Sequence, residues 1–318
     1  MPNPPDTDGG SAGRDPADHL RAAVGRLRQW RRGDERAPHK PLLVLHALGR
    51  VARGDARLVA FADVEDDLAA LLEEFGRPRS TQRPRYPFWR LQTDGIWEVE
   101  GAERIVVDAS GDPPVGQLRR CRGGFPVDLW QRLRDDSHLV AELARTLLDA
   151  HFPPSSHDEV LGRVGLDGLV ATARPARDPG FRLAVLRAYG YRCAVCGWDG
   201  ALDRTPVALE AAHVRWHAAG GPERADNGLA LCAVHHQALD RGALGIDDDR
   251  RIMVASAFHG GMAARHWLIR FAGRPLAQPQ LDAVLDDAHR AWHEREVFRD
   301  PPRSEVAVAA EDSDDYQP

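Results

Sequence analysis

Three cysteines and one histidine are spaced as two pairs that suit a tetrahedral metal ion. The chain reads CAVC at 193–196 and CAVH at 232–235. One pair is therefore Cys193 with Cys196, and the other is Cys232 with His235. Two such pairs, brought together in space, supply four soft ligands for a closed structural zinc site. We predict that these four residues bind Zn2+ and stabilise the fold around it.

The same segment contains two further histidines and an asparagine that the zinc site does not use, namely His213, Asn227 and His236. Hydrolysis of a phosphodiester needs an activated water and a divalent cation that neutralises the developing charge. A neutral imidazole with a pKa near the working pH can take the proton from that water. His235 and His236 are adjacent, so on a helix they point about 100° apart. One can face the zinc while the other faces a second site.

The order His, Asn, His within a zinc knuckle resembles the HNH (ββα-metal) nucleases. The resemblance implies that His213 ends a strand and is the general base, and that Asn227 positions the base or helps to hold the metal. It also implies that His236 opens a helix and binds the catalytic cation, for which we expect Mg2+ or Mn2+. Many members carry Asp or His just before the base, where this chain has Ala212. Glu210 lies on the same strand face as Ala212, so we consider it the substitute ligand.

The composition is that of a folded chain with room for two domains. The 318 residues are 43% hydrophobic, and no apolar run approaches the roughly 18 residues of a membrane span. Residues 1–18 lack the apolar core of a signal peptide. Three of the four cysteines are assigned to zinc, which excludes a disulfide framework and suits a reducing compartment. We expect a cytoplasmic protein with no membrane segment.

The net charge of −6 is an average over unlike segments. Residues 77–90 contain five arginines and no acid, whereas residues 305–318 are acidic and contain no base. The distribution of charge, rather than the sum, decides whether a surface can bind a nucleic acid. The negative total therefore does not exclude DNA as a partner.

Hydrophobic periodicity and turn signals predict an α+β protein. In the first half they indicate helices over 42–48 and 61–75, a basic loop over 77–90, a hairpin around 94–95 and a long helix over 126–150. In the second half they indicate a helix over 181–189, a hairpin around 247–250 and a terminal helix over 281–298. We expect a mainly helical N-terminal DNA-binding domain with a small sheet, followed by a ββα-metal domain with a zinc knuckle.

The predicted boundaries follow from composition. The ends lack apolar periodicity and are expected to be disordered, and a stretch rich in small residues, Pro and Gly is expected to be the linker. The resulting segments are a disordered 1–15, a recognition domain over 16–168, a linker over 169–180, a nuclease domain over 181–300 and an acidic, disordered tail over 301–318.

Two motifs in the first half resemble the sulfur-binding domain of phosphorothioation-dependent restriction endonucleases. They are APHKPLLVLHALGR at 37–50 and YPFWRLQTDGIWEV at 86–99. The resemblance covers residues 16–168 and implies that the partner is double-stranded DNA in which sulfur replaces a non-bridging phosphate oxygen. In that family the domain is commonly coupled to a C-terminal HNH domain, which is the order in this chain.

An apolar pocket can distinguish sulfur from oxygen because sulfur is larger, softer and less strongly hydrated. An ordinary phosphate oxygen in such a pocket loses its water at a cost of a few kcal/mol. We expect the apolar wall to come from Tyr86, Pro87 and Trp89. We expect charge-assisted contacts with the DNA backbone from Arg36, His39, Lys40 and Arg90. We expect guanine edges to be read by Arg119, Arg120 and Arg122.

Two other functions stay open at the level of the sequence. One is an HNH nuclease that reads another mark, such as 5-methylcytosine, which needs a base-flipping pocket. The other is a DNA-binding module with an inactive zinc domain, for which Ala212 is the only support. Because one HNH site cuts one strand, we also expect a homodimer, with a contact on an apolar face of the nuclease domain or on its C-terminal helix near Trp292. The alternative is a monomer that nicks each strand in a separate encounter.

Overall fold

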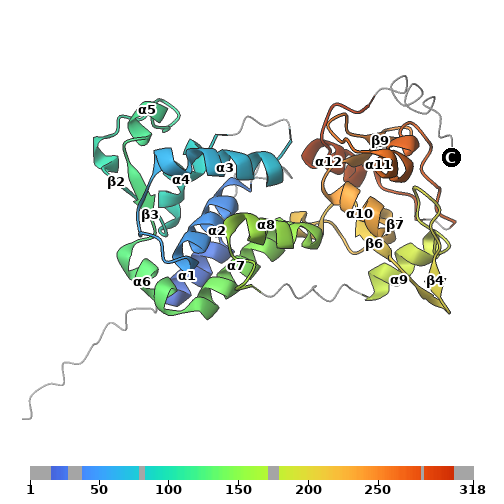
Figure 1. Ribbon diagram of the computed structural model, residues 1–318, viewed down its shortest axis with the longest axis horizontal. Helices are drawn as coiled ribbons and strands as arrows, with labels where there is room; N and C mark the ends of the chain where they lie inside the picture. Colours follow the sequence, from blue (N-terminus) through green and yellow to red (C-terminus); the bar gives the residue numbers. More distant parts are fainter. Residues whose placement is uncertain (1–15, 28–37, 79–82, 171–178, 281–282, 304–318) are drawn as a thin grey trace, which may run out of the picture.

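The structure is a computed structural model, and it describes residues 16–27, 38–78, 83–170, 179–280 and 283–303. Figure 1 shows two bodies side by side, a helical N-terminal body and a mixed C-terminal body. Each body has its own buried apolar cluster, one drawn from residues 17–170 and the other from residues 181–285. The predicted α+β class, with a mainly helical first region and a ββα-metal second region, is confirmed.

Helix α2 (His39–Ala52) is the centre of the N-terminal body. Its run LLVLHALG is buried on every side, as expected of a helix that is apolar all round. It packs against α3 (Phe61–Phe75), α4 (Arg85–Arg90), α6 (Val127–Asp135), α7 (Ser137–His151) and α8 (His157–Val164). Gly49 permits a close approach to α8, because a Cβ atom there would lie 1.8 Å from the carbonyl oxygen of Val164.

A small antiparallel sheet covers the far end of this body. Its strand order is β1 (Val59–Ala60), β3 (Arg122–Gly124), β2 (Glu98–Glu100). The remaining elements of the body are short: α1 (Pro16–Gly25), η1 (Leu91–Asp94), η2 (Ala102–Arg104), α5 (Val115–Leu118) and η3 (Pro154–Ser156).

Three sequence predictions in this body are wrong. The basic loop expected over 77–90 is helical from Arg85 to Arg90, where helix α4 lies. The long helix expected over 126–150 is two helices, because the carboxylate of Asp136 accepts a hydrogen bond from the backbone N–H of Leu139 at 3.0 Å and starts α7 anew. The hairpin expected around residues 94–95 is absent, since residues 85–94 are helical. Gly95, at φ +75°, ends that helical stretch, and the strand after it pairs with residues 122–124 instead.

The C-terminal body is built on an antiparallel pair followed by a helix. Strand β6 (Leu209–His213) pairs with β7 (Gly228–Cys232), and α10 (Ala233–Asp240) follows at once. Two 3-10 turns, η4 (His217–Ala219) and η5 (Ala225–Asn227), lie in the connection between the strands. Around this ββα unit lie α9 (Pro179–Ala188), β4 (Ala201–Leu202), β5 (Thr205–Pro206), β8 (Leu244–Ile246), β9 (Ile252–Val254), α11 (Met262–Trp267), η6 (Ile269–Phe271) and α12 (Asp287–Glu296).

The terminal helix α12 is shorter than the predicted 281–298 and is capped by Asp286, whose carboxylate accepts from the Ala288 N–H at 2.7 Å. Trp292 and Phe298 are fully buried against the same body. The Trp292 ring packs edge-on against Trp216 inside the body.

In the part of the chain that the structure describes, no helix is both long and apolar enough to cross a membrane. The predictions for residues 1–15 and for most of the linker and tail lie outside the described residues.

Candidate metal centre, nuclease site and DNA interface

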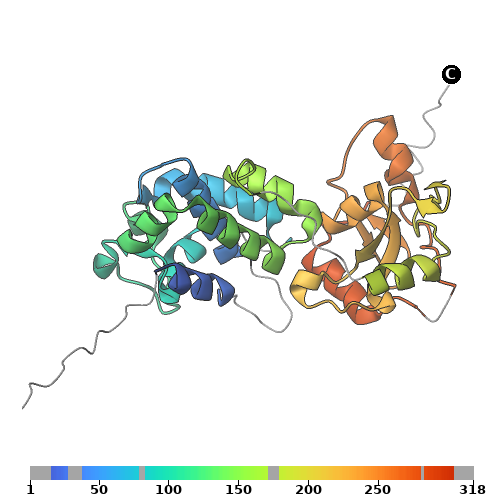
Figure 2. The ribbon, with the colours of Figure 1, turned by 90° about the horizontal axis from the view of Figure 1, so that it is seen from below.

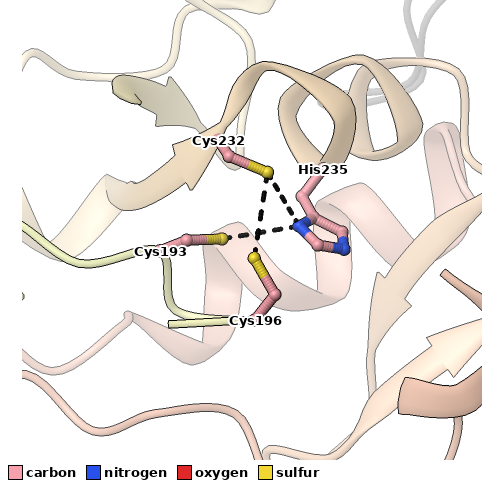
Figure 3. Close-up of side chains that lie close together, drawn as sticks. All are labelled: Cys193, Cys196, Cys232 and His235. Carbon is pink, nitrogen blue, oxygen red and sulfur yellow. Dashed lines mark hydrogen bonds between the residues drawn. The ribbon is translucent and has the colours of Figure 1, made fainter. Parts of the chain in front are cut away.

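The two Cys/His pairs meet in a single cluster, as Figure 3 shows. Cys193 and Cys196 come from the loop after α9, Cys232 ends β7, and His235 lies in the first turn of α10. His235 Nδ1 is 3.1 Å from Cys232 Sγ and 3.5 Å from Cys193 Sγ. One ligand atom from each residue lies within 4.8 Å of the other three. This donor set and spacing fit a tetrahedral soft cation.

Hydrogen bonds around the cluster orient its ligand atoms and change their pKa values. His235 Nε2 donates a hydrogen bond to the Trp267 carbonyl at 2.7 Å, which leaves Nδ1 as the ligand atom. Hydrogen bonds from Cys196 and Cys232 hold the pKa of the Cys193 thiol far below its usual value. Burial lowers the pKa of His235, but hydrogen bonds with Cys193 and Cys196 outweigh burial and raise it to about 9. A bound cation would replace protons that the cluster now shares.

His213 ends β6, and its imidazole lies between an aromatic ring and a carboxylate. The ring stacks on Phe181, with centroids 4.1 Å apart and planes 11° from parallel. Its Nε2 atom lies 3.2 Å from Oε2 of Glu223, whose other oxygen lies 3.3 Å from Nδ1 of His217. The carboxylate beside Nε2 and the Phe181 ring against its face favour one orientation of this imidazole, a side chain suited to general-base chemistry.

Asn227 precedes β7 and holds the connection between the two strands. Its side chain is fully buried, and its oxygen accepts from the Arg215 N–H at 2.8 Å. Its amide nitrogen donates to the carbonyls of Arg215 at 2.9 Å and Pro222 at 3.0 Å. These contacts fix the backbone two residues after His213. The family resemblance implies two roles for Asn227, positioning the base or helping to hold the metal. These contacts favour the first.

His236, on α10, lies between two carboxylates. Its Nδ1 atom is 2.5 Å from Oε2 of Glu210, and its Nε2 atom is 3.3 Å from Oδ2 of Asp240. Ala212, where many relatives have a ligand, is fully buried. Glu210, the expected substitute for a ligand at position 212, thus lies next to His236. Carboxylate oxygens and imidazole nitrogen are suitable ligands for Mg2+ or Mn2+.

Sequence reasoning missed Glu223, Phe181 and Asp240. Asp240 had a signal, because it follows His236 by four residues and therefore shares its helix face. Glu223 and Phe181 had none, since only the folded chain brings them to His213.

The residues expected to recognise sulfur gather on α4 and the start of α2. The ring of Tyr86 is surrounded by three guanidinium groups, those of Arg83, Arg85 and Arg90, at 5.2, 5.3 and 5.1 Å from its centre. Next to Tyr86, Pro87 is buried. An aromatic wall and a cationic rim therefore lie side by side.

Several of the expected phosphate contacts already have protein partners. Lys40 forms an ion pair with Asp94, and Arg90 pairs with Asp112 at 2.6 Å. Burial lowers the pKa of His39. Trp89 is half-buried and donates a hydrogen bond to the Gly111 carbonyl at 3.1 Å. Arg36 lies outside the described residues.

The three arginines expected to read bases lie on α5's end and on β3. Arg119 pairs with Glu65 at 2.6 Å, Arg122 donates to the Leu58 carbonyl at 3.1 Å, and Arg120 is exposed. These three arginines thus lie on a different segment from Tyr86. All three are exposed to solvent.

Family models match both bodies. Residues 17–169 match the ScoMcrA-like DNA sulfur-binding domain, and residues 193–247 match the HNH endonuclease model. The protein is therefore a two-domain HNH-type nuclease. Its N-terminal domain belongs to the ScoMcrA-like DNA sulfur-binding family, which confirms the predicted resemblance.

The chain is also similar to several solved structures. The chain is similar to the sulfur-binding domain of ScoMcrA complexed with phosphorothioated DNA, with 30% identity over 47% of this chain and 97% of that one, at a TM-score of 0.43. It is similar to the Type IV phosphorothioation-dependent restriction endonuclease ScoMcrA, with 29% identity over 50% of this chain and 35% of that one, at a TM-score of 0.43. It is also similar to the modification-dependent TagI restriction endonuclease, with 28% identity over 39% and 40% of the two chains, at a TM-score of 0.31. A comparison with curated proteins gave no match.

Proposed function

We propose that this protein binds phosphorothioated DNA through its N-terminal domain and hydrolyses a phosphodiester bond nearby with its HNH domain. The observation that carries the proposal is the pairing, in one chain, of a sulfur-binding domain with a ββα site that has a carboxylate-oriented histidine. The match with a sulfur-binding domain favours phosphorothioate over methylcytosine, the other mark that we considered. The paired Glu210 and His236 argue against an inactive zinc domain.

In the proposed mechanism, His213 takes a proton from the attacking water while Glu223 holds its ring. Glu210 and His236 would hold a divalent cation, Mg2+ or Mn2+, which would supply charge stabilisation at the phosphate. Asp240, at the other ring nitrogen of His236, orients that imidazole. Asn227 keeps the loop between β6 and β7 in place. The cluster of Cys193, Cys196, Cys232 and His235 holds Zn2+ and has a structural role.

For recognition, we propose that the sulfur lies against Tyr86 and Pro87, with Trp89 as a further part of the wall. Arg36, His39, Lys40 and Arg90 are proposed to bind phosphates, and Arg119, Arg120 and Arg122 to read bases. The arginines around Tyr86 extend this set to Arg83 and Arg85, which the sequence analysis did not single out.

We also propose that two chains act together, since one site cuts one strand. The proposed contact is an apolar face of the nuclease domain or the surface of its C-terminal helix near Trp292, whose own side chain is buried. We propose the same domain boundaries as before, with the recognition domain at 16–168, the linker at 169–180 and the nuclease domain at 181–300. We also propose a cytoplasmic location, where the DNA that the protein acts on lies.

The deciding experiment compares duplexes of one sequence with and without a phosphorothioate linkage. Wild-type protein is expected to bind and cut the modified duplex preferentially, and His213→Ala to bind it without cutting. Equal cutting of both duplexes by the wild type would refute the proposed selectivity.

A further inference from the structure

The sulfur-binding domain contacts the nuclease site directly through one hydroxyl group. Ser155, in η3, donates a hydrogen bond to Oδ2 of Asp240 at the end of α10. The same oxygen lies 3.3 Å from Nε2 of His236. The Asp240 side chain is only 5% exposed, so few other donors can replace this one. One carboxylate oxygen thus joins a residue of the first domain to a proposed cation ligand of the second.

Other contacts hold the two bodies at this junction. Arg241, next to Asp240, forms an ion pair with Glu159 of α8. Arg299 donates to the backbone carbonyls of Glu73 at 2.7 Å and of Glu74 at 2.5 Å. Arg77 lies 3.1 Å from a carboxylate oxygen of Glu296, which is fully buried. Arg295 also pairs with Glu296, at 3.0 Å, so Arg77 adds a second cation to a buried carboxylate, and losing it on separation is unfavourable.

The first domain also touches the other side of the nuclease site. Helix α7 packs against η4, the turn that follows His213 by four residues. Figures 1 and 2 show α7 and α8 on the end of the N-terminal body that faces the ββα unit. The recognition domain therefore rests both on the loop after the base and on the end of the helix that carries His236.

We propose that Ser155 is a positioning residue of the nuclease site, supplied by the sulfur-binding domain, and that it holds Asp240 where its carboxylate orients the imidazole of His236. The inference rests on the proposed function, since it uses His236 as a ligand of the divalent cation. A carboxylate turns freely about its side-chain bonds unless a second group holds it. Outer groups that orient metal ligands typically change metal affinity by about 10- to 100-fold.

The test uses the zinc-loaded full chain and Mn2+ as the probe. Ser155→Ala should weaken Mn2+ binding, measured by calorimetry without DNA, by about 10-fold or more. Ser155→Thr, which keeps the hydroxyl, should restore it. Ser156→Ala is the matched control, because the buried Ser156 hydroxyl donates to Pro153 at 2.9 Å within the same turn and does not contact Asp240. Binding of the phosphorothioated duplex should be the same in all three variants.

Two results would overturn the inference. One is wild-type Mn2+ affinity in folded Ser155→Ala, and the other is an equal loss in Ser155→Ala and Ser156→Ala. If Ser155→Ala does not fold, Asp240→Asn takes its place and should weaken Mn2+ binding, because His236 loses the carboxylate that orients it. Wild-type Mn2+ affinity in folded Asp240→Asn would then overturn the inference, because Ser155 acts only through Asp240. Failure of the proposed function is seen separately, as a wild-type protein that binds Mn2+ but does not cut phosphorothioated DNA.

Discussion

The Glu223 carboxylate approaches Nε2 of His213 to 3.2 Å, while the opposite edge of that carboxylate faces His217. The pair gives the proposed base a fixed ring orientation before any substrate arrives. Its two members are separated by a loop that Asn227 holds in place. The geometry at the base therefore depends on the loop as much as on the strand.

Replacing Glu223 with Gln should lower the rate of cleavage by about tenfold or more, because the base loses the group that orients it. Affinity for phosphorothioated DNA should not change, since Glu223 lies in the other body. Single-turnover cleavage and gel-shift binding measure the two quantities. Glu103→Gln, on an exposed turn, is the control. Full activity in Glu223→Gln would show that Glu223 does not orient His213.

His213→Ala should reduce cleavage by about 10²- to 10⁴-fold, the usual contribution of a general base. Binding should persist because the base acts in the transition state. The variant loses the stacking contact with Phe181, so its thermal unfolding has to be measured beside its activity. A folded His213→Ala protein that cuts at nearly the wild-type rate would contradict the assignment.

Loss of the metal from the Cys/His cluster should unfold the C-terminal body. The cluster joins the loop after α9 to the end of β7 and the start of α10, so its ligands hold three segments together. Cys193→Ser, or a strong chelator, should make residues after 180 sensitive to protease while the N-terminal body resists. Zinc content and limited proteolysis report the result. A zinc-free protein that stays resistant and active would refute a structural role.

Tyr86→Ala and Lys40→Ala should differ in selectivity. The Tyr86 variant should lose more affinity for phosphorothioated than for plain DNA, because an apolar wall senses sulfur. The Lys40 variant should lose affinity for both, because a cation senses phosphate charge in either duplex. Binding curves for the two duplexes at one salt concentration decide this. Equal losses in Tyr86→Ala would remove Tyr86 from the sulfur pocket.

The buried His46 should make the N-terminal body less stable in acid. Burial lowers the pKa of His46 to about 4, and the nearby Arg50 and Arg53 lower it against the opposing effect of Asp67. Between pH 6.5 and 4, His46 is therefore protonated in the unfolded chain but neutral in the folded chain. Stability is kept above pH 6.5 and falls as the pH approaches 4, by up to about 3 kcal/mol.

Urea unfolding of wild type and His46→Gln at pH 7 and pH 4.5 measures this contribution. The variant should show a smaller loss between the two pH values, because Gln does not titrate. The same pH dependence in both proteins would assign acid sensitivity to other groups.

The chemistry was predictable from the sequence where it depends on short spacings. The two Cys/His pairs and the His, Asn, His order are local patterns, and the structure gathers the four pair residues as their spacing indicates. Helix α3 has the predicted bounds because Gly76 ends its apolar periodicity. Glu223 and Ser155 were not predictable, because each reaches its partner only through the fold. The hairpin at Asp94-Gly95 was misread because the same Gly conformation that suits a turn also ends a helix.

Gly49 has a consequence for the distance between reading and cutting. Its missing side chain lets α8 lie close against the central helix, and α8 with η3 forms the face that rests on the nuclease domain. A methyl group at this buried position would clash with the Val164 carbonyl oxygen and displace α8 away from α2. The spacing between the DNA mark and the cut would then change, although residue 49 contacts neither DNA nor the nuclease site. We therefore expect the cutting distance to depend partly on a residue in the hydrophobic core.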